Sequence, residues 1–178
     1  MTLNLYAVGN CTLDLKAFIA KVELTQVGTN ATEKRDHPIR VEEDTVGEVL
    51  ISLKCLPTAQ RIEVGLLKVK CASLSISPHK DVYARIDIFG NQRKQKHQKS
   101  TLRAKSNLIV FNETFQFTLP DPVTKECLVL ISMYQVQSTG KSLIGQASLG
   151  SGSNEDDHWQ LMMQSARQPV AKWHPLLI

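Results

Sequence analysis

Two neighbouring segments, residues 47–56 and 61–70, alternate apolar and polar side chains, and this period of two restricts what the chain can form. In the first segment the apolar residues fall at every second position: Val49, Ile51, Leu53 and Cys55. A strand with one buried face has this period, whereas a half-buried helix repeats about every 3.6 residues. Pro57 interrupts the first run, so the pair is expected to form two strands joined by a turn.

Further short strands are expected along the rest of the chain. The candidate segments are residues 82–89, 96–102, 114–119, 127–134, 144–149 and 173–177. Many short strands at nearly regular spacing are typical of an antiparallel β-sandwich, which predicts an all-β fold. One helix is expected near the C-terminus, with Ser153 as its N-cap and Pro169 after its end. Its expected apolar face consists of Trp159, Met162, Met163 and Ala166.

The composition is that of one ordinary globular domain and gives no sign of catalytic or metal chemistry. Of the 178 residues, 42% are hydrophobic and 21% are charged, which is enough apolar surface to bury a core. The five histidines are scattered without a metal-ligand spacing, and no Ser-His-Asp order or carboxylate pair indicates an active site. We therefore expect that the protein is not an enzyme and uses no cofactor.

The four cysteines are expected to be buried, reduced thiols of a cytosolic protein. They are Cys11, Cys55, Cys71 and Cys127. Each lies in or beside an apolar run and no two have a metal-binding spacing; a disulfide framework is the alternative. The sequence shows no signal peptide and no apolar run of about 18 residues. We expect a cytoplasmic protein with peripheral membrane association, through its own surface or through sequence outside this chain.

The first part of the chain predicts a domain boundary. Residues 25–46 are polar and lack any period, as in a linker. A domain is therefore expected at residues 47–178. Residues 1–24 hold only two strand candidates, and two strands cannot bury a sandwich core by themselves. We expect residues 1–46 to be poorly ordered or to pack opportunistically.

An internal similarity gives residues 1–24 a second interpretation. Residues 5–8 and 18–22 flank a polar loop and are similar to residues 133–136 and 143–147, which also flank a polar loop. Chance similarity between two hairpins is one explanation. The other is that residues 1–24 are the last two strands of a preceding copy of the same module.

Several motifs between residues 46 and 178 occur in a characteristic order. They are Gly47-Glu48-Val49-Leu50-Ile51-Ser52-Leu53, Leu56-Pro57-Thr58-Ala59-Gln60-Arg61-Ile62, Asp81-Val82-Tyr83, Phe111-Asn112-Glu113-Thr114-Phe115-Gln116-Phe117, Leu143-Ile144-Gly145, His158-Trp159 and Trp173-His174-Pro175-Leu176. No single motif is specific, but together they resemble the second C2 domain of a divergent synaptotagmin. Residues 1–24 resemble the tail of the first C2 domain. The resemblance implies an eight-stranded antiparallel C2 β-sandwich with one short helix near the C-terminus, and a role in membrane trafficking.

In the family, aspartates on two loops at one end of the sandwich bind calcium, and this chain lacks most of them. Only Asp81 fits the first loop. In the second loop the family's three aspartates fall opposite Tyr134, Val136 and Ser142. Calcium takes six to eight oxygen ligands, largely carboxylates, which these three side chains cannot replace. The resemblance therefore implies a degenerate calcium site that holds no metal. The alternative role of Asp81 is to order its loop as a turn or capping residue.

A basic segment is the strongest binding candidate. Six cations fall within 13 residues: Arg93, Lys94, Lys96, Lys99, Arg103 and Lys105. Alternation would put Lys94 and Lys96 on one face of a strand and Arg93 on the other. The resembled family has a polybasic strand here that contacts anionic phospholipid headgroups and SNARE proteins. The alternative is a solvated edge strand whose lysines prevent edge pairing. The segment contains no aromatic residue, which argues against single-stranded nucleic acid.

The last strand carries a second binding candidate. Trp173, His174 and Leu176 match a Trp-His-x-Leu motif that the resembled family uses in protein docking. The alternative is that Trp173 anchors the strand to the core.

We therefore expect a calcium-independent C2 protein that acts in vesicle trafficking and exocytosis. Its expected partners are phospholipid membranes and SNARE-type or other trafficking proteins, and it self-associates into homo- or hetero-oligomers. The alternative function is a scaffold that binds only proteins.

Overall fold

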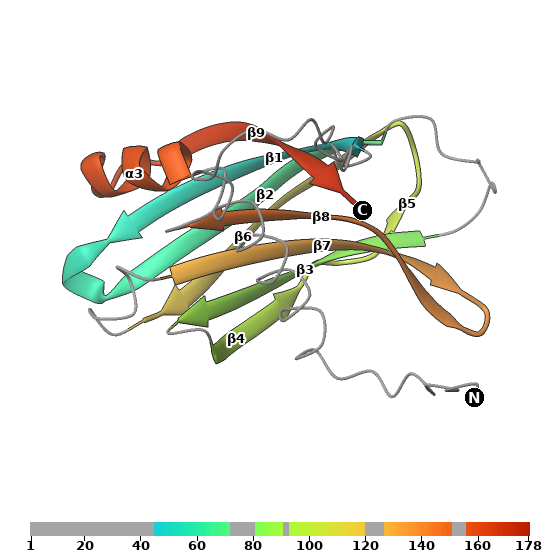
Figure 1. Cartoon of the computed structure of the whole chain (residues 1–178), viewed down its shortest axis with the longest axis horizontal. Helices are drawn as coiled ribbons and strands as arrows, with labels where there is room; N and C mark the ends of the chain where they lie inside the picture. The colour runs from blue at the N-terminus through green and yellow to red at the C-terminus, as the bar shows by residue number, and fades with distance from the viewer. Residues whose placement is uncertain (1–44, 72–80, 91–92, 120–126, 151–155) are drawn as a thin grey trace, which may run out of the picture. The chain divides into compact units, whose positions relative to one another are not determined.

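The computed structural model describes residues 45–71, 81–90, 93–119, 127–150 and 156–178, which form an antiparallel β-sandwich (Figure 1). Its elements are β1 (Thr45–Leu56), η1 (Pro57–Ala59), β2 (Arg61–Cys71), β3 (Asp81–Gly90), β4 (Arg93–Lys99), β5 (Arg103–Ala104), β6 (Leu108–Thr118), β7 (Cys127–Gln137), β8 (Gly140–Gly150), α3 (Asp156–Gln164) and β9 (Val170–Leu177). The expected all-β sandwich with one helix is thus confirmed.

The hydrogen-bonded strands divide into two sheets. Their order is β4-β3-β7-β8-β9-β1-β2-β6, and the two-residue β5 pairs with β3 off this path. Between β8 and β9 the ladder narrows to the single pair Gln146 and Leu177. We therefore call β4-β3-β7-β8 the first sheet and β9-β1-β2-β6 the second sheet. Each sheet contributes one face to the core between them, which leaves two outer faces.

The alternation that predicted β1 and β2 corresponds to their buried faces. Val49, Ile51 and Leu53 of β1 have no exposed surface, and Val64 of β2 pairs directly with Leu53. The register shifts after Leu50. This shift changes which positions of β2 face inward, so the buried residues run Ile62, Val64, Leu66 and then Val69.

Most strands extend beyond the predicted segments, and β8 begins at Gly140 instead of residue 144. β6 begins at Leu108 instead of residue 114, and β9 begins at Val170 instead of residue 173. In β6, Asn112 has a left-handed backbone with φ of 52°, and the polar residues around it conceal the continuation of the strand. β1 begins at Thr45, so the last two residues of the predicted linker belong to the sandwich. The predictions for residues 1–44 lie outside the described residues.

The cysteines agree with the expectation of reduced thiols where the structure describes them. Cys55 and Cys127 are buried and Cys71 is half-buried, and all three are unbridged. Burial raises the pKa of the Cys127 thiol to about 12, so it stays protonated and unreactive at neutral pH. Cys11 lies outside the described part of the chain. No helix within the described ranges is long and apolar enough to cross a membrane.

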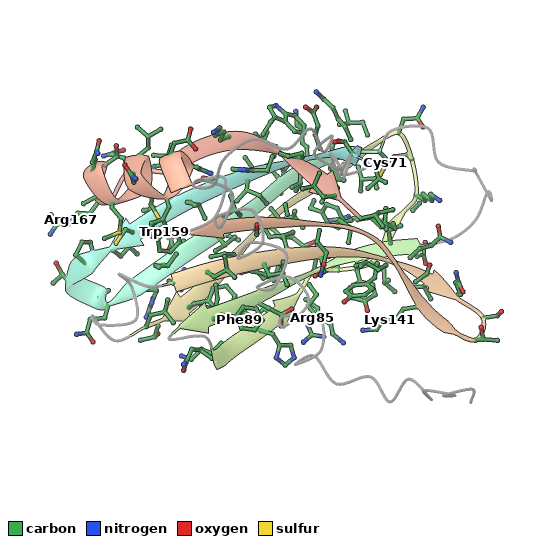
Figure 2. The ribbon with its side chains drawn as sticks, viewed as in Figure 1. Cys71, Arg85, Phe89, Lys141, Trp159 and Arg167 are labelled. Carbon is green, nitrogen blue, oxygen red and sulfur yellow. The ribbon has the colours of Figure 1, made fainter. Side chains whose placement is uncertain are left out.

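The helix packs with part of the face predicted from the sequence. His158, Trp159 and Met162 are buried, and Figure 2 shows Trp159 pointing from α3 toward the strands. Met163 is 41% exposed, and Ala166 is an exposed residue beyond the helix end, so neither belongs to the apolar face. The prediction is confirmed for Trp159 and Met162 and wrong for Met163 and Ala166, because buried His158 occupies part of the inward-facing stripe. Ser153, the expected N-cap, lies outside the described residues.

A buried histidine pair fastens α3 to β9. His158 Nδ1 lies 2.8 Å from His174 Nε2, and the two rings stack with centroids 4.9 Å apart. His158 Nε2 lies 2.9 Å from the carbonyl oxygen of Val170, which can only accept, so we assign the proton of neutral His158 to Nε2. His174 Nε2–H then donates to His158 Nδ1. The pair links two elements through one continuous set of hydrogen bonds.

We predict that His158→Ala lowers the free energy of unfolding by about 2 kcal/mol, because it removes both hydrogen bonds and leaves buried polar groups without these partners. Urea denaturation measures the change. Gln164→Ala, at an exposed position of the same helix, is the matched control and should change stability by less than about 0.5 kcal/mol. Equal stabilities of the two variants would contradict the role assigned to the pair.

Candidate functional site

The basic segment divides between two sides of the first sheet. Residues that pair across an antiparallel ladder point to the same side. Lys96 pairs with buried Ile88, so it lies on the inner side, toward the second sheet. Lys99 pairs with Arg85 and His97 pairs with Asp87, and both lie on the outer side.

The inner-side residues cover the open edge of β6. Lys96 Nζ donates to the carbonyl oxygen of Thr118 at 2.9 Å, and Gln98 Nε2 donates to that of Gln116 at 2.9 Å. Arg103 Nη2 donates to the carbonyl oxygen of Phe111 at 3.4 Å. Since β6 ends the strand order, these carbonyls have no neighbouring strand. Lys96, on the edge strand β4 of the first sheet, thus covers the edge strand β6 of the second sheet.

On the outer side, four side chains form a continuous row across the first sheet. Lys99 Nζ lies 5.8 Å from the ring centroid of Tyr83, and the Tyr83 and Tyr134 rings stack with centroids 5.5 Å apart. Lys141 Nζ lies 4.3 Å from the Tyr134 centroid. The row crosses β4, β3, β7 and β8, and Figure 2 labels Lys141 near the β7–β8 hairpin. We call Lys99, Tyr83, Tyr134 and Lys141 the Lys-Tyr row.

Two other basic residues of the predicted binding segment contact groups within the protein. Arg103 lies 3.8 Å from Glu113, and Lys105 Nζ donates to Gln135 Oε1 at 2.7 Å. Arg93 and Lys94 belong to β4, but their side chains are outside the described part.

The predicted pairing of Lys94 with Lys96 on one face does not follow from the register. Lys96 pairs with Ile88 but Lys94 pairs with Phe89, because the ladder shifts between these two residues of β3. A period of two therefore does not connect Lys94 and Lys96. Alternation of side chains between two faces holds only in a regular strand, and this irregularity interrupts it.

Sequence reasoning missed half of the Lys-Tyr row. In the sequence Tyr83 belongs only to the motif Asp81-Val82-Tyr83, and Lys141 lies far from the basic segment at residues 93–105. The usable signal was the tight hairpin between Gln137 and Gly140, which pairs Lys141 with Val136 and so brings it beside Tyr134. The stacking of Tyr83 on Tyr134 follows from their direct pairing between β3 and β7.

The positions expected to form a degenerate calcium site lie at one end of the first sheet. Asp81 starts β3 and is exposed, whereas Val136 is 37% exposed. Ser142 accepts a hydrogen bond from Gln137 at 2.9 Å. Tyr134 carries a lysine ammonium above its ring, so a cation already lies beside this position. Among the residues that the structure describes, no cluster of three His, Cys, Asp or Glu could hold a metal.

The terminal strand presents only one of its three predicted docking residues. Trp173 is half-buried and lies on the outer side of the second sheet, paired with Leu50, with Lys70 Nζ 4.1 Å from its ring centroid. His174 and Leu176 are 1% and 0% exposed. Their side chains anchor the strand to the interior, so they cannot contact a partner directly. Any docking through this motif therefore falls to Trp173.

The strand order, with a short helix before the last strand, defines an antiparallel β-sandwich of the C2 class. The C2 domain family matches residues 60–176, and this chain belongs to that family. Human synaptotagmin-2 is 29% identical over 139 residues, covering 76% of this chain and 33% of that protein. Synaptotagmin-B of Diplobatis ommata is 27% identical over 173 residues, covering 94% of this chain and 39% of that protein. The chain thus spans between a third and two fifths of the length of these relatives.

Solved structures confirm the fold. The third C2 domain of the KIAA1228 protein matches with a TM-score of 0.58 at 15% identity, covering 85% of this chain and 95% of that one. A C2 domain of RIM from Drosophila also matches with a TM-score of 0.58 at 15% identity, covering 75% of this chain and 99% of that one. At this identity the likeness concerns architecture alone.

We predict that calcium leaves the melting temperature of the protein unchanged to within about 1 °C, because Asp81 is the one carboxylate among the four positions Asp81, Tyr134, Val136 and Ser142 and offers too few ligands. A site filled at a hundred times its Kd would add about 2.7 kcal/mol and raise the melting temperature by several degrees. Thermal unfolding in calcium chloride and in EDTA tests this. The positive control restores the three carboxylates as Tyr134→Asp, Val136→Asp and Ser142→Asp. A calcium-dependent rise in the unsubstituted protein would contradict the prediction.

Proposed function

We propose that this chain is the second C2 domain of a synaptotagmin-type protein and binds anionic phospholipid surfaces without calcium. The observation that carries the proposal is the Lys-Tyr row, which places two ammonium groups and two phenols on one outer face. By its relatives, the process is vesicle trafficking and exocytosis, with the protein cytoplasmic and peripherally bound to membranes. The proposed site has a binding role and no catalytic one.

The chemistry of the row suits phosphate headgroups. A lysine held over an aromatic ring keeps its charge and its three donors, so it can still bind a phosphate oxygen. The phenolic hydroxyls add two further donors. At the end of the sheet where the sequence predicts a degenerate calcium site, Lys141 brings a positive charge beside Tyr134.

The expected affinity is low and depends on salt. Each basic residue near an anionic membrane contributes about 1 kcal/mol, and this attraction fades beyond a Debye length of about 8 Å at physiological salt. Lys96, Arg103 and Lys105 donate to protein groups in this structure, which leaves fewer available cations than the sequence count suggests. That reduction keeps the rival function, a scaffold that binds only proteins, as the second candidate. SNARE-type partners and oligomer formation belong to either candidate.

Liposome co-sedimentation tests the proposal. Vesicles containing phosphatidylserine or phosphoinositide should bind the protein equally in EDTA and in calcium, and less at high salt. Lys99→Glu with Lys141→Glu should weaken binding at least about tenfold, since it replaces two attractions by two repulsions. The matched control is Lys68→Glu with Lys70→Glu, an identical charge change on the second sheet, which should bind vesicles nearly as well as the unsubstituted protein.

Three outcomes would overturn this function. If the protein binds vesicles only in the presence of calcium, the site is a calcium-dependent lipid site. Equal loss in both double variants would show that net charge acts instead of the Lys-Tyr row, and no binding at any salt concentration would favour the protein-only scaffold.

A further inference from the structure

The outer face of the second sheet carries an apolar surface that the proposed lipid site does not use. Two rows of paired residues cross its four strands from β9 to β6. One row is Trp173, Leu50, Lys68 and Val110, and the next is Pro175, Glu48, Lys70 and Leu108. We call Trp173, Leu50, Val110, Leu108, Lys68 and Lys70 the Trp-Leu face.

These side chains point to solvent. Leu108 and Val110 are 49% and 44% exposed, and Trp173 and Leu50 are half-buried. The interleaved positions Val49, Val69 and Ile109 are buried, so the core is already supplied by the inner face. An antiparallel sheet normally carries polar residues on its solvent side, and a cluster of large apolar residues there marks an interaction surface. α3 lies beside the start of β9 and away from its C-terminal end (Figure 1).

The charges around this surface have a net positive sign. Lys70 Nζ lies 3.3 Å from Glu48 Oε2 and 4.1 Å from the Trp173 ring centroid. The charge of Glu48 is therefore balanced by that of Lys70. Lys68 is exposed and makes no ion pair with another residue in the described part of the chain. A complementary partner therefore offers apolar side chains flanked by carboxylates.

We propose that the Trp-Leu face binds an acidic amphipathic helix of a partner protein. Lys68 and Lys70 stand two residues apart on β2, a spacing of about 6.6 Å along the strand. Carboxylates at positions i and i+4 of a helix are separated by a rise of about 6 Å, which matches this spacing. A helix about 10 Å wide covers two to three strands spaced about 4.8 Å apart. A helix lying along β9 and β1 can therefore place its apolar stripe on Trp173 and Leu50 and its carboxylates beside the two lysines of the neighbouring β2.

Other occupants fit the surface less well. An added strand would need acceptors along β6, but the carbonyls of Phe111, Gln116 and Thr118 already accept from side chains. A membrane is disfavoured because Trp173 and Leu50 are half-buried in a sheet face instead of projecting from loop tips. The Lys-Tyr row lies on the opposite outer face, so one bilayer cannot contact both surfaces together. A domain held on a membrane by that row would turn the Trp-Leu face toward the cytosol.

The fluorescence of Trp173 allows a direct test. The chain has two tryptophans, and Trp159 is 4% exposed in the core, so a ligand on this face should change the emission of Trp173 alone. The probe is a tryptophan-free synthetic helix of about five turns, with leucines on one stripe and glutamates beside it. We expect a saturable blue shift, which Trp173→Phe abolishes. A scrambled peptide of the same composition should bind at least about tenfold more weakly.

Matched variants separate this inference from the proposed function. Lys68→Glu with Lys70→Glu should weaken peptide binding at least about tenfold and spare vesicle binding, whereas Lys99→Glu with Lys141→Glu should do the reverse. Circular dichroism and thermal unfolding confirm that each variant folds. Leu50→Ser, in the strand between Trp173 and the two lysines, gives a second test that leaves the charges unchanged and should also weaken peptide binding.

Three results would overturn the inference. Equal binding of the scrambled peptide would show simple charge attraction. A Trp173 blue shift caused by phosphatidylserine vesicles, and lost with Lys68→Glu and Lys70→Glu, would assign the face to lipid. Sedimentation that shows dimers of the unsubstituted chain and monomers of this double variant would make a second copy the occupant.

Discussion

The shared core between the two sheets is the constraint on which the rest of this structure depends. Every described strand except β4 and the two-residue β5 contributes side chains to it, from Val49 and Ile51 in β1 to Ile131 and Met133 in β7. These inner faces are therefore unavailable for binding. Function must be sought on the two outer faces and at the strand ends, and the outer faces differ in chemistry. One carries lysines on stacked tyrosines, and the other carries lysines beside exposed aliphatic groups.

The Lys-Tyr row includes Tyr134, one of the positions at which the sequence predicts a degenerate calcium site. There, the stacked rings of Tyr83 and Tyr134 and the ammonium of Lys141 form one continuous contact. An aromatic pair contributes about 0.5–1.5 kcal/mol beyond its buried area, and an exposed cation–π contact about 0.5–1 kcal/mol. These interactions pre-order the surface without a bound ion. The resulting surface presents two lysine ammonium groups beside these aromatic rings.

The fold could be predicted from the sequence because alternation and turns are local signals. The binding surfaces could not, because they depend on register between distant strands. Counting cations along residues 93–105 could not reveal that Lys96 reaches β6, or that Lys105 bonds Gln135. The motif at Trp173 suggested docking by three residues, but alternation along β9 buries His174 and Leu176. The missing information was in each case the identity of the neighbour across the ladder.

The separation of the two sheets has a consequence for how the surfaces act together. Packed sheets lie about 10 Å apart, and the lysine ammonium groups on the two outer faces are farther apart still. At physiological salt the Debye length is about 8 Å, so charge neutralised on one face is screened from the other. The sandwich therefore keeps the charges of its two outer faces apart, beyond the range of their electrostatic attraction. Occupying one face should neither strengthen nor weaken the charge attraction at the other, so the two proposed contacts would add without cooperativity.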